Sequence, residues 1–147
     1  MENDVAPANV GFQLKAIEIL EFSLYSQSQP ITDIFTYHTN LSLEHRISEQ
    51  NSIILVLPTA ELIHEDKKTI LAKIRVSFIY EFNSFEGFLT AKSGVYNFPQ
   101  EIMVALNSIS ISTLRGIMFS LFRGTFLHKA ILPVVDPKSF ILEEIPK

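Results

Sequence analysis

The sequence predicts an α+β fold in which a four-stranded antiparallel meander sheet packs against one long C-terminal helix. Two observations carry this prediction. Three segments within residues 12–82 alternate apolar and polar side chains, a period of two that is typical of half-buried strands, and a fourth segment between them is apolar at its start. Between Pro99 and Gly124 the apolar residues recur instead at spacings of three and four, which is typical of a helix. A length of 147 residues suits a single domain spanning residues 1–147, and residues 1–11 are predicted to be a flexible leader.

The first predicted strand covers residues 12–25. One parity of this strand is apolar, and its members are Phe12, Leu14, Ala16, Leu20, Phe22 and Leu24. Ile17, Glu18 and Ile19 break the alternation, so we expect a twist or a bulge near the middle of the strand. The small polar residues that follow, together with Pro30, suit a connection.

Three further strands are predicted at residues 35–47, 53–63 and 70–82. The segment 53–63 begins with apolar residues on both parities, as expected of a strand that is covered on both faces. Pro58 lacks the N–H that a ladder needs and predicts an edge position or a bulge. Polar turns connect these strands, which predicts a meander with one wet face.

The helix is predicted from its ends as well as from its period. Pro99 suits the first helical position, Glu101 suits the positive end of the helix dipole, and Gly124 suits the position after the last turn. Residues 108–113 read SISIST and alternate like a strand, but the flanking pattern favours the helix. The predicted apolar face consists of Ile102, Leu106, Ile109, Leu114, Ile117, Met118, Leu121 and Phe122.

Another face of the same helix carries a stripe at spacings of three and four, formed by Ser108, Ser112, Arg115 and Phe119. Two interpretations of this stripe stay open. Its small residues either face solvent or allow the helix of a second subunit to approach closely. The second interpretation predicts an oligomer interface at these four residues.

Composition and charge exclude several classes of function. The absence of cysteine excludes disulfides, thiolate metal sites and cysteine nucleophiles. A formal charge of -4 gives no electrostatic case for a nucleic-acid partner. The first ten residues lack the basic start and apolar core of a signal peptide, and no apolar run approaches the ~20 residues that span a bilayer. We therefore expect a cytoplasmic protein with no membrane insertion.

No catalytic or metal-binding arrangement is found in the sequence. The four histidines are spread over separate elements, without an HExxH motif, and neither a GxSxG motif nor a glycine-rich phosphate loop is present. His64, Glu65 and Asp66 form a trio that suits a metal or acid/base site, but a solvated turn is the favoured interpretation at a charged hairpin tip. We predict no catalytic residues, no metal and no cofactor, and hence a protein that is not an enzyme.

Short motifs occur along nearly the whole chain in an order that is specific when they are taken together. They are FQLKAIEILEFSLYS from Phe12, then Phe98-Pro99 before the helix, then RGTF at 123–126, and finally Leu132-Pro133-Val134 and Asp136. On these residues the sequence resembles the SecB family of protein-export chaperones. The resemblance implies a four-stranded sheet backed by a long helix and assembled as a dimer of dimers, that is, a homotetramer.

The resemblance also implies a function. Members of this family bind unfolded polypeptides in apolar grooves without nucleotide, so the chain is expected to be an ATP-independent holdase for unfolded, nascent or pre-secretory polypeptides. By position, the groove would be lined by Ile31, Ile34, Phe35, Phe126, Leu127, Ile131, Leu132 and Val134. Taken singly, each of the post-helix residues is better explained by packing on the sheet.

Departures from the family pattern leave the partner open. The family contacts the motor ATPase SecA through acidic residues on the sheet, and Glu21 and Glu65 match such positions, but Tyr25 stands where another acid is expected. The C-terminal FILEEIPK is shorter than the family's C-terminal segment, which implies a divergent member. The alternatives are a dedicated SecB-like chaperone of one partner, such as an antitoxin, and a small-ligand-binding or enzymatic α+β domain.

Overall fold

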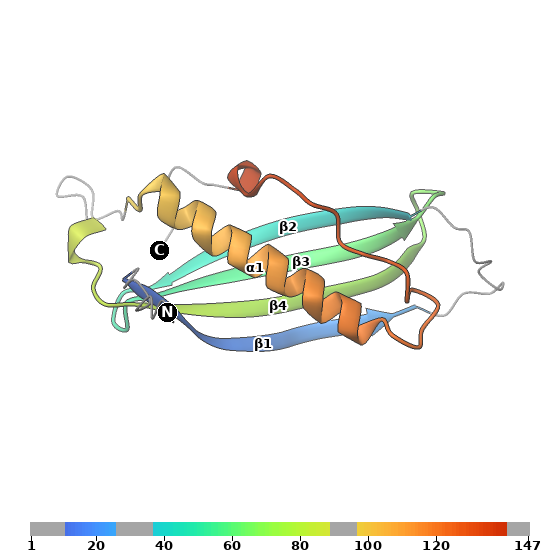
Figure 1. Cartoon of the computed structure of the whole chain (residues 1–147), viewed down its shortest axis with the longest axis horizontal. Helices are drawn as coiled ribbons and strands as arrows, with labels where there is room; N and C mark the ends of the chain where they lie inside the picture. The colour runs from blue at the N-terminus through green and yellow to red at the C-terminus, as the bar shows by residue number, and fades with distance from the viewer. Residues whose placement is uncertain (1–10, 26–36, 89–96, 141–147) are drawn as a thin grey trace, which may run out of the picture.

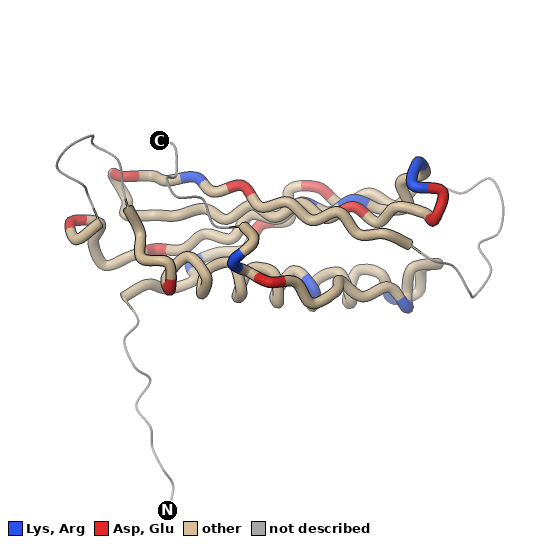
Figure 2. The backbone as a smooth tube through the Cα atoms, turned by 90° about the horizontal axis from the view of Figure 1, so that it is seen from above, with Lys and Arg blue, Asp and Glu red and all other residues tan. Residues whose placement is uncertain are grey.

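The computed structural model describes residues 11–25, 37–88 and 97–140 (Figure 1). It has two layers, a four-stranded antiparallel sheet and one long helix across one face of the sheet, which Figure 2 shows from a second direction. The elements are β1 (Phe12–Leu24), β2 (Tyr37–Ser48), β3 (Ile53–His64), β4 (Ile70–Phe82), η1 (Glu86–Phe88), α1 (Gln100–Leu121) and η2 (Pro137–Phe140). The predicted α+β class, with four antiparallel strands and one long helix, is confirmed.

The strand order across the sheet is β1-β4-β3-β2. β2, β3 and β4 form an antiparallel meander, but β1 pairs with β4 and lies at the opposite edge from β2. The prediction that the meander runs through all four strands is therefore wrong for β1. The length of the connection permits this arrangement, because the residues between Leu24 and Tyr37 span up to roughly 40 Å when extended. Three strand spacings require only about 14 Å.

Pro58 lies in a central strand. It is opposite Leu43 of β2. The register of β3 with β4 is the same on both sides of Pro58, because Val56 pairs with Phe78 and Thr59 pairs with Arg75 without a shift. The prediction of an edge or a bulge at Pro58 is therefore wrong. The missing N–H removes one donor from the ladder without shifting its register.

β1 contains two register shifts, one between Leu14 and Ala16 and one between Ile19 and Glu21, which confirms the predicted irregularity. An extra residue at each shift changes which side chains face the helix. As a result, six apolar residues lie opposite core residues of β4 and share the helix side of the sheet: Phe12, Leu14, Ile17, Ile19, Phe22 and Leu24. Ala16 pairs with Ile79, on the other face, so its assignment to the apolar side is wrong.

α1 crosses the sheet diagonally, from the β2 side at its start to the β1 side at its end (Figure 1). At that end the rings of Phe22 and Phe122 have their centroids 6.1 Å apart. The carbonyl of Pro99 accepts the N–H of Ile102 at 3.1 Å, which begins the helix. The chain turns away at Gly124, whose φ of 76° lies in the left-handed region that glycine adopts without steric cost.

The buried face of α1 differs from the predicted apolar face. Residues 108–113 are helical, as predicted, but Ile109 is 38% exposed whereas Ser110 is fully buried. The Ser110 hydroxyl lies 2.7 Å from the hydroxyl of Tyr80, and an internal hydrogen bond of this kind offsets the cost of burying both groups. Apolar spacing alone therefore misplaced part of the face. The buried residues are Met103, Leu106, Asn107, Ser110, Ile111, Leu114 and Met118.

Candidate functional site

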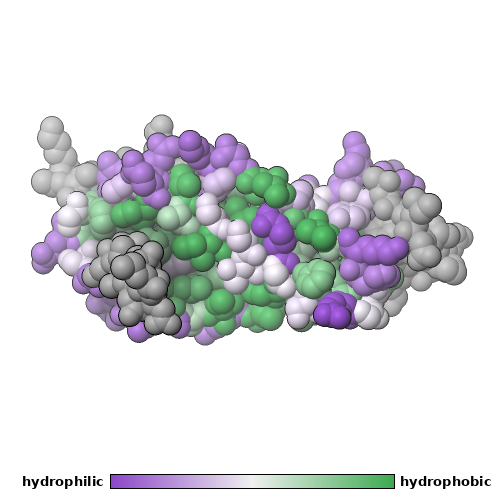
Figure 3. Space-filling view, in the orientation of Figure 1, coloured by the Kyte–Doolittle hydropathy of each residue, from purple (hydrophilic) through white to green (hydrophobic). Residues whose placement is uncertain are grey.

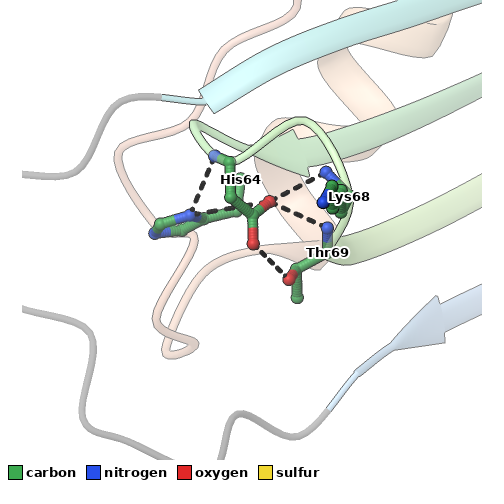
Figure 4. Close-up of polar contacts among 4 residues, drawn as sticks. His64, Lys68 and Thr69 are labelled. Carbon is green, nitrogen blue, oxygen red and sulfur yellow. Dashed lines mark hydrogen bonds and ion pairs between the residues drawn. The ribbon is translucent and has the colours of Figure 1, made fainter.

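The charged hairpin tip between β3 and β4 is a turn held by its own side chains (Figure 4). The Asp66 carboxylate accepts the backbone N–H groups of Lys68 and Thr69, both at 2.9 Å, and the hydroxyl of Thr69 at 2.6 Å. These hydrogen bonds, that of the Thr69 hydroxyl first, lower the pKa of Asp66 to about 2. Across the described parts of the chain, no group of three or more His, Cys, Asp or Glu residues could hold a metal ion.

The chain that leaves α1 runs back alongside the helix and over β2 (Figure 1). We call residues 130–136 of this segment the strap. The strap has no regular secondary structure, yet the side chains of Ala130 and Leu132 are each only 1% exposed and lie in the core. These two anchors make the strap a fixed part of the fold.

The strap presents two large apolar side chains to solvent. Ile131 is 53% exposed and Val134 is 91% exposed. Leu127 and Leu132 are buried instead, so their predicted place on a peptide-binding surface is corrected, and both belong to the core. Phe126 is half-buried and packs against the core. Successive side chains of an extended segment point in opposite directions, which explains why neighbours in the predicted set have opposite exposures.

Two side chains from different elements hold the main chain of the strap. Arg115 of α1 donates from Nε to the carbonyl of Leu132 at 2.8 Å and from Nη2 to the carbonyl of Pro133 at 3.0 Å. The hydroxyl of Tyr37 in β2 accepts the N–H of Ile131 at 3.0 Å and donates to the Ile131 carbonyl at 3.3 Å. Three consecutive residues of the strap are thereby tied to the helix and to the sheet.

A buried polar bridge links β2, α1 and η2. The Asn107 side chain donates from Nδ2 to the carbonyl of Pro137 at 3.3 Å, and its Oδ1 lies 2.7 Å from Nε2 of His45. Because a carbonyl oxygen only accepts, this orientation of the amide requires the proton of His45 to sit on Nε2. The Nδ1 of His45 is buried without a hydrogen-bond partner in the described structure. Burial lowers the pKa of His45 below its ordinary 6.5, against a smaller opposing effect of the Asn107 hydrogen bond.

The helix side of β1 is largely uncovered, because α1 reaches this strand only near one end (Figure 1). Phe12 is buried in the core, but six other large apolar side chains of β1 remain between 36% and 51% exposed, namely Leu14, Ile17, Ile19, Leu20, Phe22 and Leu24. Figure 3 shows apolar side chains spread over the face that carries α1. Sequence reasoning identified only part of the apolar side of the strand, because the register shifts bring Ile17 and Ile19 onto it. It also missed this exposed surface, since coverage depends on the crossing direction of the helix.

The predicted oligomer stripe lies on the outer part of α1. Ser112 is exposed, Ser108 is half-buried and Phe119 is 49% exposed. Arg115 is engaged by the strap of its own chain, so its guanidinium serves an intramolecular contact. Apart from Arg115, the only charged residue of α1 is Glu101. The outward surface of α1 therefore carries few charges. Its role in an oligomer stays a prediction.

By length and composition alone, α1 is long and apolar enough to cross a membrane, and it is the one such helix in the ranges that the structure describes. This corrects the expectation that no apolar run approaches that length. The core helix of a soluble protein passes the same test. Leu106 and Leu114 of α1 are fully buried within the molecule, so packing on the sheet accounts for the inner face of the helix.

The face of the sheet opposite α1 carries ion pairs. Lys73 Nζ lies 3.6 Å from Glu21 Oε2, and Arg75 Nη2 lies 3.2 Å from Glu44 Oε2. Figure 2 shows charged residues along the sheet layer and its turns, and others along the helix and the segment that follows it. Glu65 is exposed at the hairpin tip. The pairing of Glu21 with Lys73 reduces the acidic character of the surface that the resemblance implied for a motor ATPase.

Part of the predicted site falls outside the described residues. This applies to Ile31, Ile34 and Phe35, which were predicted to line the groove, and to residues 1–10 of the predicted leader. The candidate site that the structure does describe is the strap, with its two exposed side chains and the residues that hold it.

Comparison with known proteins gives a structural likeness without a sequence match. No protein-family model matches the sequence, and no curated protein sequence matches it. Among solved structures, the chain is similar to the SecB-like chaperone Rv1957 of Mycobacterium tuberculosis, in complex with a ChAD peptide from the antitoxin Rv1956 HigA1. The TM-score is 0.59 at 14% sequence identity, over 84% of this chain and 89% of that chain. The likeness shows that the fold is SecB-like.

Proposed function

We propose that this chain is an ATP-independent chaperone that binds apolar segments of non-native polypeptides in the cytoplasm. The observation that carries the proposal is the strap, which presents Ile131 and Val134 to solvent while Ala130 and Leu132 anchor it in the core. The SecB-like fold supports the proposal, because the similar chaperone Rv1957 was solved with a bound peptide. Holding a polypeptide requires exposed apolar surface and no catalytic group.

The magnitude of this interaction indicates that one strap binds weakly. Burying each exposed side chain under a client contributes ~1.5–3 kcal/mol before ordering costs. Association itself costs roughly 4–15 kcal/mol, which exceeds the contribution of two side chains in most of that range. Useful affinity therefore requires further apolar residues, such as the predicted Ile31, Ile34 and Phe35, or several straps that bind one client at once.

We also propose that several copies of the chain associate, as the predicted dimer of dimers does. Two surfaces support this proposal, namely the uncovered apolar side of β1 and the outer face of α1 around Ser112 and Phe119. Soluble monomers rarely leave large contiguous apolar patches exposed. Light scattering on the purified chain gives the mass directly, and the mass of a single chain would contradict the proposal.

The holdase activity is tested by aggregation of an unfolding client without ATP. The wild-type chain should suppress light scattering at molar excess over the client. The double variant Ile131→Ser/Val134→Ser should lose most of this effect, because it removes both exposed side chains of the strap. A matched control is Ile70→Ser, which removes an apolar side chain that is 36% exposed at the start of β4. Equal suppression by the control and the double variant would contradict a role for the strap.

A dedicated chaperone of one partner is the second candidate function. It is favoured by the similar structure, in which the bound peptide comes from an antitoxin. In a pull-down from cell extract, a dedicated chaperone should retain one polypeptide, whereas a general holdase should retain many. Delivery of pre-secretory clients to a SecA-type motor has less support, because Glu21 is already paired with Lys73. Binding of purified motor that is lost in Glu21→Lys and Glu65→Lys would establish it.

A further inference from the structure

We propose that Arg115 and Tyr37 are positioning residues that hold the strap in the conformation in which Ile131 and Val134 face solvent. The inference rests on the proposed function, since it assigns these two residues to the same polypeptide-binding surface. Neither residue is itself offered as a contact for the client. Their role is to fix the main chain from which the contacting side chains project.

Arg115 ties the strap to the helix. It lies in the C-terminal half of α1, and its planar guanidinium donates to the carbonyls of two consecutive residues, Leu132 and Pro133, at 2.8 Å and 3.0 Å. Hydrogen bonds from a charged donor are the stronger ones, and the fork geometry orients both acceptors at once. Among the ion pairs of the described residues, none involves Arg115. Both hydrogen bonds that the Arg115 side chain makes in the described structure go to the strap.

Tyr37 ties the same stretch to the sheet. A single hydroxyl accepts the N–H of Ile131 and donates to the carbonyl of Ile131, so both main-chain polar groups of that residue are satisfied by one side chain. Tyr37 is the first residue of β2. The strap therefore has one attachment to the helix and one to the sheet, immediately beside its two exposed side chains.

These attachments also define what a client can contact. The carbonyls of residues 131, 132 and 133 are all engaged by Arg115 and Tyr37, and Pro133 has no N–H. Several main-chain groups at this part of the strap are thus already engaged or absent, so the exposed side chains of Ile131 and Val134 are the main contact offered to a client. The substrate class assigned to this surface is polypeptide with exposed apolar side chains, recognised without a strand register.

The test compares Arg115→Met and Tyr37→Phe with the control Arg123→Met. Arg115→Met keeps a long apolar side chain and removes both donors, and Tyr37→Phe keeps the ring and removes the hydroxyl. Arg123 is exposed just beyond α1, so Arg123→Met removes the same charge without touching the strap. Arg115→Lys is the conservative variant. It should keep part of the strap attachment that Arg115→Met loses, because an ammonium group still donates hydrogen bonds but lacks the fork geometry of a guanidinium.

Two readouts are measured on each variant. Amide hydrogen exchange of Ile131, whose N–H donates to the Tyr37 hydroxyl, should become about tenfold faster or more in Arg115→Met and in Tyr37→Phe, while the amides of β3 and β4 keep their rates. The affinity for a fluorescent unfolded peptide rich in Leu and Val should fall by about tenfold in the same two variants and stay unchanged in Arg123→Met. A merely stabilising role would change β3 and β4 as well.

The outcomes separate this inference from the proposed function. Faster strap exchange with unchanged peptide affinity would overturn the positioning role, and so would unchanged exchange in both variants. If the wild-type chain ignores the peptide, the proposed function fails, and the inference about binding falls with it, whatever the exchange data show. If Arg115→Met does not fold, Tyr37→Phe still decides the question, since it removes one oxygen atom and leaves the ring in place.

Discussion

Replacing Asn107 with leucine should destabilise the fold by roughly 1–3 kcal/mol, because it leaves a buried imidazole N–H without an acceptor. In the wild type, Asn107 is fully buried and its Oδ1 lies 2.7 Å from Nε2 of His45. Leucine has a similar volume, so packing changes little, but the donor of His45 loses its partner. The Nδ1 of the same ring already has none in the described structure. The carbonyl of Pro137, which is half-buried, regains a partner from water more easily.

The magnitude translates into a measurable shift. For a chain of this size, 1 kcal/mol lowers Tm by roughly 2–4 °C, so Asn107→Leu should melt several degrees below the wild type. The decisive comparison is the double variant His45→Leu/Asn107→Leu. Replacing both partners of a buried hydrogen bond with apolar groups is often nearly neutral, so the double variant should be more stable than either single variant. Urea unfolding of all four proteins gives the coupling. Additive losses in the double variant would refute the reasoning.

Three further predictions concern protonation and assembly. Burial lowers the folded-state pKa of His45, so the unfolded chain binds more protons than the folded chain. The contribution of His45 to stability should therefore be full above pH 6.5 and decline as the pH falls below it. The difference between the urea midpoints at pH 7.5 and pH 5.5 should be smaller in His45→Leu than in the wild type. The pKa of Asp66, measured by carboxyl NMR, should be about 2, and its contribution to the turn should be lost as the pH falls from 3.8 toward that value. Thr69→Val should raise this pKa. A pKa near 3.8 in the wild type would be incompatible with the turn described. If copies associate through the outer face of α1, Ser112→Arg should lower the mass measured by light scattering without changing the far-UV spectrum. An unchanged mass of the oligomer would instead favour an interface at β1.

The strands and the helix were predictable because their apolar periods are set by local sequence. Where β1 lies in the sheet was not predictable in the same way, since the pairing of Phe12 with Phe82 joins residues far apart in sequence. The two bulges of β1 left a visible signal, the break at Ile17, Glu18 and Ile19. That signal indicated an irregularity but not the face to which each side chain would turn.

The candidate site was predictable only as a segment. The motif after the helix pointed to the right stretch of chain, but Leu132 and Ile131 have opposite exposures, at 1% and 53%. Apolar residues of similar size look alike in sequence, and only the path of the strap alongside the helix and over β2 decides which of them is buried. Arg115 was assigned to an oligomer stripe from its helical spacing alone. Nothing in the local sequence indicates that its guanidinium meets carbonyls from a segment 17 residues later in the chain.

The bridge through Asn107 has a consequence for the chemistry of the core. Because the Pro137 carbonyl dictates which way the amide points, a residue near the C-terminal end of the described chain selects the tautomer of an imidazole in the second strand. A chain cut before residue 137 would let that amide rotate, and the ring could then carry its proton on either nitrogen. Nitrogen chemical shifts of the imidazole would thus report whether the segment around Pro137 is docked.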